Sequence, residues 1–208
     1  MQTKWKILIA IFTLVVFADQ ATKFLAVKHL TYGFDVAGAK TLPAQIGAFY
    51  SDQDLLDHHL SAEPVYVARN FWAFRYAQNR GAAWGLLATL PAGARVPFFH
   101  IVSIVAVIFI LSYVRKLQPE QRYLQVAFSL VLGGAVGNFI DRLARGYVID
   151  FIDWYWHDPQ FLAYTRHWPT FNVADSAISV GVVLLLLESF LSKKHAPDPK
   201  LQTRTKVA

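Results

Sequence analysis

The sequence predicts an all-α integral membrane protein: a four-helix transmembrane bundle with a small β-containing extracytoplasmic lobe. Of its 208 residues, 55% are hydrophobic and 16% are charged, a balance too apolar for an ordinary soluble domain. Four apolar runs, at about 6–28, 97–114, 123–141 and 173–191, approach the ~20 residues that a helix needs to cross a bilayer. The stretch at about 30–90 contains no such run and forms the expected lobe.

Composition also excludes several kinds of site and partner. The chain has no cysteine, which excludes disulfides, thiolate metal sites and a cysteine nucleophile. None of its seven histidines lies in an HExxH pattern, which disfavours zinc-protease chemistry. We expect no metal and no cofactor. The net charge of +6 comes from lysines and arginines at the edges of apolar runs and in the tail, which favours membrane orientation over binding to nucleic acid.

The first apolar run follows Lys4 and Lys6 and therefore resembles a signal peptide. No convincing small-x-small cleavage pattern follows it, and apolar residues resume at 24–27, so we expect an uncleaved first helix. Within it, Asp19 and Lys23 are spaced i,i+4, share one face and can form an ion pair. The pair suits a structural clip as well as a functional site. Asp19 lies well past the middle of the bilayer, roughly 20 Å beyond Lys4 at ~1.5 Å per residue.

The lobe at 30–90 has two segments with a readable pattern. Residues 63–76 are rich in Val, Tyr, Phe and Trp and predict strands, and 52–60 suit a short amphipathic helix. Asp57, His58 and His59 hint at a metal site, but adjacent residues on a helix do not face one another, so a solvated face is the better interpretation.

Residues 79–87, NRGAAWGLL, follow the predicted strands. Small residues allow close backbone approach, and Asn79 can hydrogen-bond a peptide or another loop. A turn and a short interfacial helix, with Trp84 at the level of the lipid headgroups, explain the segment equally well. We also consider it as a lid over a bound peptide, with Gly81 and Gly85 as hinges.

Basic residues cluster before the first span, between the second and third, and after the fourth. The positive-inside rule therefore places both termini in the cytoplasm, and the lobe and the 141–172 connection outside. Polar residues from three spans then converge toward the outer leaflet: Asp19, Asn138, Asp141, Asp150, Asn172 and Asp175.

Two local motifs hold most of these polar residues. In GNFIDR, Asn138, Asp141 and Arg142 share one helical face, which suits a positioning network, and Gly133, Gly134 and Gly137 allow tight helix packing. In FNVAD, Asn172 can cap the fourth helix and Asp175 can interact with the helix dipole.

Asp150 and Asp175 flank the connection between the third and fourth spans and should emerge on one membrane face. Two carboxylates held close at a partly dry site cannot both ionise, so one keeps a proton while the other can accept one from water. This is the arrangement that an aspartic protease needs. The aromatic loop between them (Trp154, Tyr155, Trp156 and Trp168) suits an interfacial belt or a contact with lipid.

Five ordered motifs together resemble those of bacterial lipoprotein signal peptidase, signal peptidase II: DQATK at 19–23, NRGAAW at 79–84, GGAVGNFIDR at 133–142, GYVIDF at 146–151 and FNVAD at 171–175. The resemblance covers nearly the whole chain. It implies an aspartic endopeptidase of the bacterial inner membrane that removes the signal peptide of diacylglyceryl-modified prolipoproteins, cutting N-terminal to the lipidated cysteine. The segment at 31–62 looks longer than is usual in the family.

The resemblance also implies roles for individual residues and partners. Asp150 and Asp175 would be the catalytic dyad. Residues that support the dyad or contact substrate would be Asp19, Lys23, Asn79, Gly81, Asn138, Asp141, Arg142 and Asn172. Residues 1–192 would form a single membrane peptidase domain, and 193–208 a cytoplasmic basic tail. Globomycin-type cyclic peptides would inhibit the enzyme, which we expect to be a monomer among membrane phospholipids with its active site toward the periplasm.

Two other functions fit membrane-embedded carboxylates. A small transporter or proton-coupled channel would use Asp and Lys in a relay, but such proteins usually show repeated halves, and no repeat is visible. A scaffold or assembly subunit would leave the carboxylates as packing clips. Processing of a purified lipoprotein precursor distinguishes these functions from a peptidase.

Overall fold

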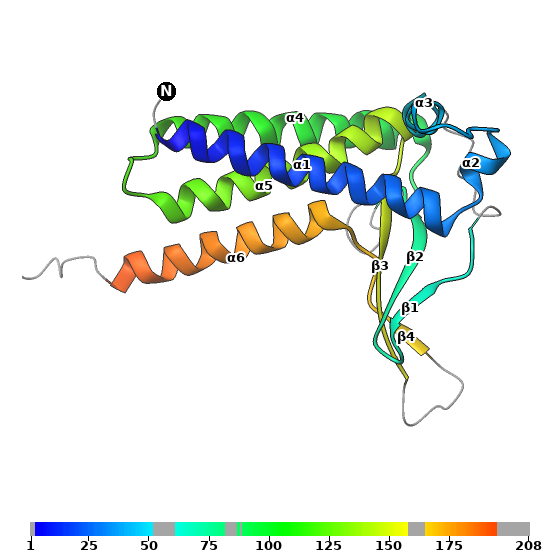
Figure 1. The fold of residues 1–208 in the computed structure, drawn as a ribbon. Coiled ribbons are helices and arrows are strands. Elements are labelled where there is room, and N and C mark those ends of the chain that lie inside the picture. Colours follow the sequence, from blue (N-terminus) through cyan, green and yellow to red (C-terminus); the bar gives the residue numbers. More distant parts are fainter. Residues whose placement is uncertain (1–2, 52–60, 82–86, 88, 158–164, 195–208) are drawn as a thin grey trace, which may run out of the picture.

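The computed structural model describes residues 3–51, 61–81, 87, 89–157 and 165–194. Its long apolar helices are α1 (Thr3–Leu30), α4 (Ala92–Lys116), α5 (Arg122–Arg145) and α6 (Val173–Lys194). They lie side by side, and a sheet stands at one end with its strands running across the helix direction (Figure 1). The predicted fold class, a four-helix membrane bundle with a small β-containing lobe, is confirmed.

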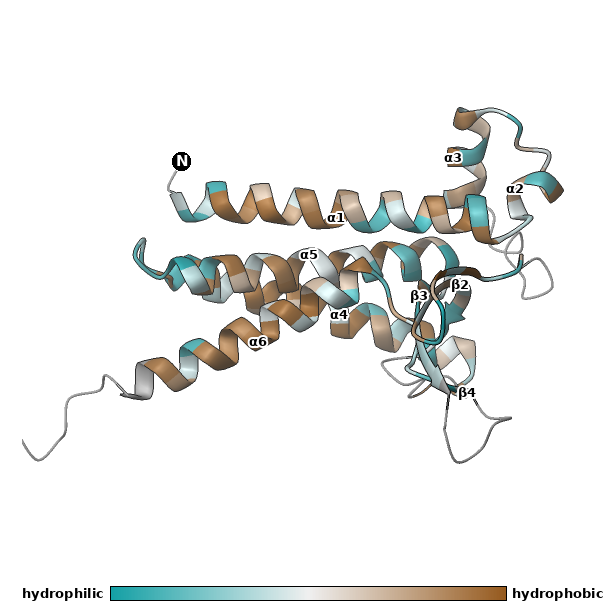
Figure 2. Ribbon diagram, turned by 60° about the horizontal axis from the view of Figure 1, so that its bottom comes forward, coloured by the Kyte–Doolittle hydropathy of each residue, from teal (hydrophilic) through white to brown (hydrophobic). Residues whose placement is uncertain are grey.

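The outer surfaces of the helices are apolar, as a surrounding bilayer requires. Figure 2 shows hydrophobic residues along most of α4 and α6. Large side chains that point away from the bundle include Phe17, Ile101, Phe109 and Phe190, which are 61–71% exposed. Polar side chains buried inside the bundle include Asp19, Lys23, Asn138 and Asp141 near the sheet, and Gln125 and Ser129 nearer the start of α5.

Helix α5 packs against α1 and α6 along its glycine-rich face. A Cβ atom at Gly133 would lie 2.8 Å from Val15 of α1, and one at Gly134 would overlap the Ala174 carbonyl of α6. Glycine at these positions lets the helix backbones approach closely, so the sequence-based prediction of tight packing is confirmed.

The helices extend beyond most of the expected span boundaries, and they do so furthest at two places. Helix α4 begins at Ala92 rather than 97, because the amides of Ala94 and Arg95 donate to the Pro91 carbonyl and start the helix before Pro97. Helix α5 continues to Arg145 rather than 141. It ends at Gly146, whose φ of 75° is in the left-handed region and whose N–H donates to the Arg142 carbonyl at 3.0 Å.

The sheet contains β1 (Val65–Ala68), β2 (Trp72–Asn79), β3 (Val148–His157) and β4 (Thr165–His167), antiparallel in that order. The expectation of strands at 63–76 is confirmed. The interpretation of the region between Asp150 and Asp175 as an aromatic loop is wrong for two parts of it. Residues up to Trp154 pair with β2, and 155–157 pair with β4 at 165–167. The aromatic residues give β3 a strand-forming composition, but its partner β2 lies about 70 residues away in the sequence.

Part of the long 31–62 segment is helical. It contains α2 (Gly33–Val36) and α3 (Leu42–Ser51), neither of which the sequence pattern indicated. The helix expected at 52–60, together with Asp57, His58 and His59, lies outside the described residues. Buried side chains from α1, α2, α3 and the sheet form one apolar cluster at this end of the molecule.

Candidate active site

A cavity of about 980 Å³ lies where the sheet meets α5 and α6. Its polar lining includes both carboxylates singled out in the sequence, Asp150 on β3 and Asp175 on α6, as well as Asn79, Asn138 and Arg142. Its apolar lining includes Trp154, Trp168, Phe171, Ile178 and Val180. The cavity therefore offers an apolar groove with a few polar groups at one place, a common form of a ligand site.

Asp175 is held by the start of α6. Asn172 Oδ1 accepts a hydrogen bond from the Asp175 amide at 2.9 Å, and Asp175 Oδ2 accepts one from the Asn172 amide at 3.2 Å. This reciprocal arrangement caps the helix and confirms the capping role expected for Asn172. The cap also determines the direction of the Asp175 carboxylate.

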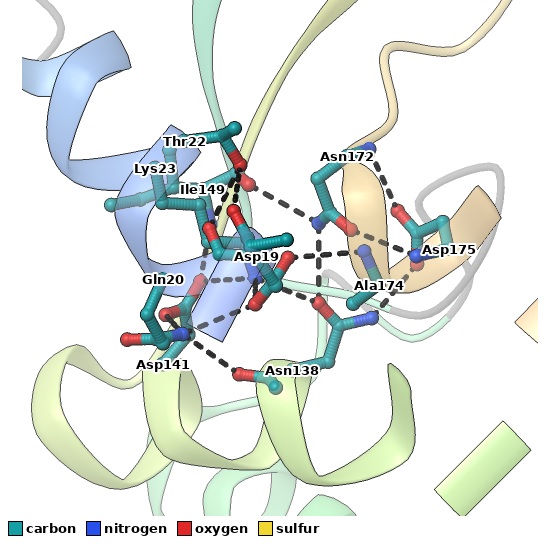
Figure 3. Close-up of polar contacts among 12 residues, drawn as sticks. Asp19, Gln20, Thr22, Lys23, Asn138, Asp141, Ile149, Asn172, Ala174 and Asp175 are labelled. Carbon is teal, nitrogen blue, oxygen red and sulfur yellow. Dashed lines mark hydrogen bonds and ion pairs between the residues drawn. The ribbon is translucent and has the colours of Figure 1, made fainter. Parts of the chain in front are cut away.

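Two side-chain amides, those of Asn172 and Asn138, connect Asp175 to Asp150. Figure 3 shows both amides beside Asp175. Asn172 Nδ2 lies 2.8 Å from Asp150 Oδ1 and 3.1 Å from Asn138 Oδ1. Asn138 Nδ2 in turn donates to Asp175 Oδ1 at 2.8 Å. The carboxylates therefore share a hydrogen-bonded frame, although they come from a strand and a helix.

Asp150 lies in β3, opposite Ala77 of β2, and is only 1% exposed. Burial and, to a lesser extent, the negative charge of Asp175 together raise the pKa of its carboxyl to about 8. Hydrogen bonds from Asn79 and Asn172 and the charge of Lys23 oppose this rise. A pKa raised to about 8 favours the protonated form of Asp150 at neutral pH.

Behind the cavity lies a buried group of charged residues. Lys23 Nζ contacts Asp19 Oδ2 at 2.8 Å and Asp141 Oδ2 at 2.9 Å, and all three side chains are fully buried. The expected ion pair between Asp19 and Lys23 is confirmed. Lys23 Nζ also donates to Asn138 Oδ1 at 3.1 Å, and Asp19 Oδ1 accepts from the Ala174 amide at 3.0 Å. The charged group thus supports both the Asn138 amide and the first turn of α6.

Arg142, like Asn138, lines the cavity. Its Nη2 donates to the Gly81 carbonyl at 3.1 Å, and its guanidinium carbon lies 4.7 Å from the centre of the Phe99 ring. Arg142 therefore lines the cavity rather than joining the buried charges. Asn79 Oδ1 accepts from the Gly81 amide at 3.0 Å, and its side chain also hydrogen-bonds Asp150. Trp84 and most of the segment considered as a lid lie outside the described residues.

Two members of the buried group were not singled out from the sequence. Gln20 Nε2 lies 3.1 Å from both Asp19 Oδ2 and Asp141 Oδ1. Arg145 Nη1 donates to Asp141 Oδ1 at 2.9 Å and is almost fully buried. The i,i+4 spacing of Asp141 and Arg145 was a usable signal, of the same kind as that of Asp19 and Lys23.

This chain is similar to known proteins in both sequence and fold. The sequence profile described as "Signal peptidase (SPase) II" matches residues 11–191. The chain belongs to the signal peptidase II family. It is therefore a peptidase, and its four apolar helices make it a multi-pass membrane protein.

Curated relatives and solved structures agree with this membership. A protein of Anaeromyxobacter sp. (strain Fw109-5) named lipoprotein signal peptidase is 52% identical over 185 residues, which cover 89% of this chain and 85% of the relative. One of the same name from Syntrophotalea carbinolica is 41% identical, covering 88% and 91%. A solved structure described as a bacterial membrane enzyme, determined by the in meso method at 2.3 Å, is 27% identical with a TM-score of 0.61 and covers 92% of each chain. Membership of the signal peptidase II family favours a peptidase over a transporter or a scaffold.

Proposed function

We propose that the chain is an aspartic endopeptidase in which Asp150 and Asp175 share one proton and activate water. The observation that carries this proposal is the raised pKa of Asp150 in a cavity that it shares with Asp175. A carboxyl that stays protonated at neutral pH, beside a second carboxylate, supports general acid and general base catalysis at one site.

In the proposed reaction, Asp175 accepts a proton from water as the water oxygen attacks the scissile carbonyl carbon. Asp150 donates its proton to the carbonyl oxygen, which gives a neutral tetrahedral intermediate. When the C–N bond breaks, the proton taken up by Asp175 passes to the leaving amine, and a hydroxyl proton of the intermediate returns to Asp150. Asn138 and Asn172 keep the two carboxyl groups in place throughout.

The proposed substrate is the signal peptide of a diacylglyceryl-modified prolipoprotein, cut N-terminal to the lipidated cysteine. The names of the relatives support a lipoprotein precursor. The apolar lining of the cavity supports a substrate whose peptide joins an apolar helix to a lipid. We further propose that the sheet end of the bundle faces the periplasm, that the enzyme acts as a monomer, and that globomycin-type cyclic peptides block the cavity.

The experiment is cleavage of a purified diacylglyceryl-modified prolipoprotein by the reconstituted enzyme, followed by mass spectrometry. Asp150→Asn and Asp175→Asn should each lower the rate by at least about 10²-fold, because an amide cannot accept or share the proton. Asp153→Asn is the matched control: Asp153 is equally buried on β3, but it pairs with Arg75 and His167 outside the cavity. Normal cleavage by either dyad variant, or no cleavage by the unmodified enzyme, would contradict the proposal.

A further inference from the structure

Helix α3 touches the rest of the protein mainly through its C-terminal end, and the proposed mechanism does not use it. Phe49 is 2% exposed and packs edge-on against Phe24 of α1, with ring centres 5.5 Å apart. By contrast, Leu42 and Ile46 of the same helix are 59% and 46% exposed. Figure 1 places α3 at the sheet end of the bundle, beside the end of α5. The docking of α3 therefore depends on a few residues near Phe49.

Arg145, the last residue of α5, joins α3 to the buried charges. Its Nε donates to the Phe49 carbonyl at 3.1 Å, and its Nη1 donates to Asp141 Oδ1 at 2.9 Å. The guanidinium carbon lies 3.9 Å from the centre of the Phe49 ring, within the range of a cation–π contact. One buried guanidinium thus holds a carbonyl and a ring of α3 on one side and a carboxylate of α5 on the other.

Asp141 links Arg145 to β3, the strand that carries Asp150. Its Oδ2 accepts a hydrogen bond from the Ile149 amide at 3.0 Å, immediately before Asp150 in the sequence. The Ile149 carbonyl also lies 3.2 Å from Asn172 Nδ2, the same nitrogen that contacts Asp150. The position of the β3 backbone at Asp150 therefore depends on where Asp141 is held.

A second contact from α3 reaches the same carboxylate. The Tyr50 hydroxyl lies 3.3 Å from Gln20 Oε1, and Gln20 Nε2 lies 3.1 Å from Asp141 Oδ1. Asp141 is thus approached from α3 by two routes, through Arg145 and through Gln20. The guanidinium carbon of Arg145 also lies 5.5 Å from the centre of the Tyr50 ring, so the two routes adjoin.

We propose that Arg145 is a positioning residue for the carboxylate pair, and that it holds the pair in its reactive arrangement by anchoring helix α3 to Asp141. This inference rests on the proposed function, because it concerns the geometry of Asp150 and Asp175. It assigns a role to the long 31–62 segment: α3 supports the site from outside the bundle.

Stability alone does not account for a buried arginine here. Buried ion pairs can often be replaced by apolar residues without loss of stability. The ion pair of Arg145 with Asp141 therefore needs an explanation other than stability. In addition, Arg145 Nη2 has no hydrogen-bond partner among the described residues, a cost that an apolar side chain would avoid. What an apolar residue cannot supply is the planar fork that fixes a carbonyl and a carboxylate relative to each other.

The test compares Arg145→Gln, Arg145→Lys and Phe49→Ala with the unmodified enzyme, using kcat and KM for prolipoprotein cleavage. We expect Arg145→Gln to lower kcat by roughly ten- to a hundredfold with KM changed by less than about twofold, because small displacements of reacting groups have effects of this size. Arg145→Lys keeps the charge but not the fork, so it should recover only part of kcat. Ile46→Ala, at an exposed position of α3, is the matched control and should leave kcat unchanged.

Two further measurements separate positioning from folding. Amide hydrogen exchange at Ile149 should become faster in Arg145→Gln while the folded fraction stays constant. Phe49→Ala removes the ring but leaves the ion pair, and its loss of kcat should be smaller in the Arg145→Gln background than in the unmodified enzyme, because both residues act on Asp141. An unchanged kcat in Arg145→Gln, or additive losses in the double variant, would overturn the inference. If the unmodified enzyme does not cleave, the proposed function fails. The link from Arg145 through Asp141 to the β3 backbone is then tested by hydrogen exchange alone, and unchanged exchange at Ile149 in Arg145→Gln would overturn it.

Discussion

Removal of the buried Lys23 should destabilise the folded protein, because its charge balances the buried carboxylates of Asp19 and Asp141. Lys23 Nζ lies 2.8 Å from one Asp19 oxygen and 2.9 Å from one Asp141 oxygen, and none of the three side chains is exposed. Lys23→Met would leave two buried carboxylates, with Arg145 on one of them. It would also remove one of the two donors to Asn138 Oδ1, the other being Asn172 Nδ2.

The size of the effect follows from this geometry. Breaking a buried ion pair by removing one partner costs about 3–5 kcal/mol, because the remaining charge has neither water nor a counter-charge. For a chain of this length, each kcal/mol lowers the melting temperature by about 2–4 °C, so Lys23→Met should lower it by roughly 6–20 °C. Asp19→Asn should also destabilise, since it leaves an excess of positive charge in the same place.

Thermal unfolding in detergent can be followed by the fluorescence of the chain's six tryptophans. Lys28→Met, on the same helix but exposed, is the matched control and should unfold like the unmodified protein. The double variant Lys23→Met with Asp19→Asn restores the charge balance and should recover at least part of the lost stability. The reasoning would be refuted by a Lys23→Met variant that unfolds within about 2 °C of the unmodified protein, or by a double variant less stable than either single one.

Three more outcomes are expected. Cleavage should decline as pH rises through about 8, because burial raises the pKa of Asp150 to about 8 and the reaction uses its protonated form; a kcat profile that stays level to pH 10 would contradict this. Gly134→Ala should lower the yield of folded protein, since its Cβ would meet the Ala174 carbonyl, whereas Gly93→Ala, with open space around it, should not. Reporter fusions at 52 and 157 should report the periplasm and one after 194 the cytoplasm; the reverse would overturn the proposed orientation.

Features that depend on neighbours in the sequence were predictable. The ion pair of Asp19 and Lys23 and the cap formed by Asn172 and Asp175 each join residues three or four positions apart on one helix turn. Helix geometry alone brings such residues together, whatever the rest of the chain does. The apolar spans were predictable for a similar reason, since a bilayer sets both their length and their composition.

Features that join segments distant in the sequence were not predictable. Residues 148–157 form a strand because β2 supplies the paired backbone, and no local pattern in the sequence shows that partner. The same holds for Arg142 and Arg145, which lie near each other at the end of α5 but serve different places. Arg142 faces the cavity and the Gly81 carbonyl, whereas Arg145 is buried against Asp141 and Phe49.

The residue types of the site and the membrane spans that carry them follow from the sequence, because lipid admits charged groups only at specific, internally satisfied positions. Which of those groups meet is a property of the tertiary structure. Asn172 contacts both Asn138 and Asp150, and these contacts need α5, α6 and β3 at fixed distances from one another. Close packing at Gly134 and the pairing of β2 with β3 set those distances, and both depend on segments far apart in the chain.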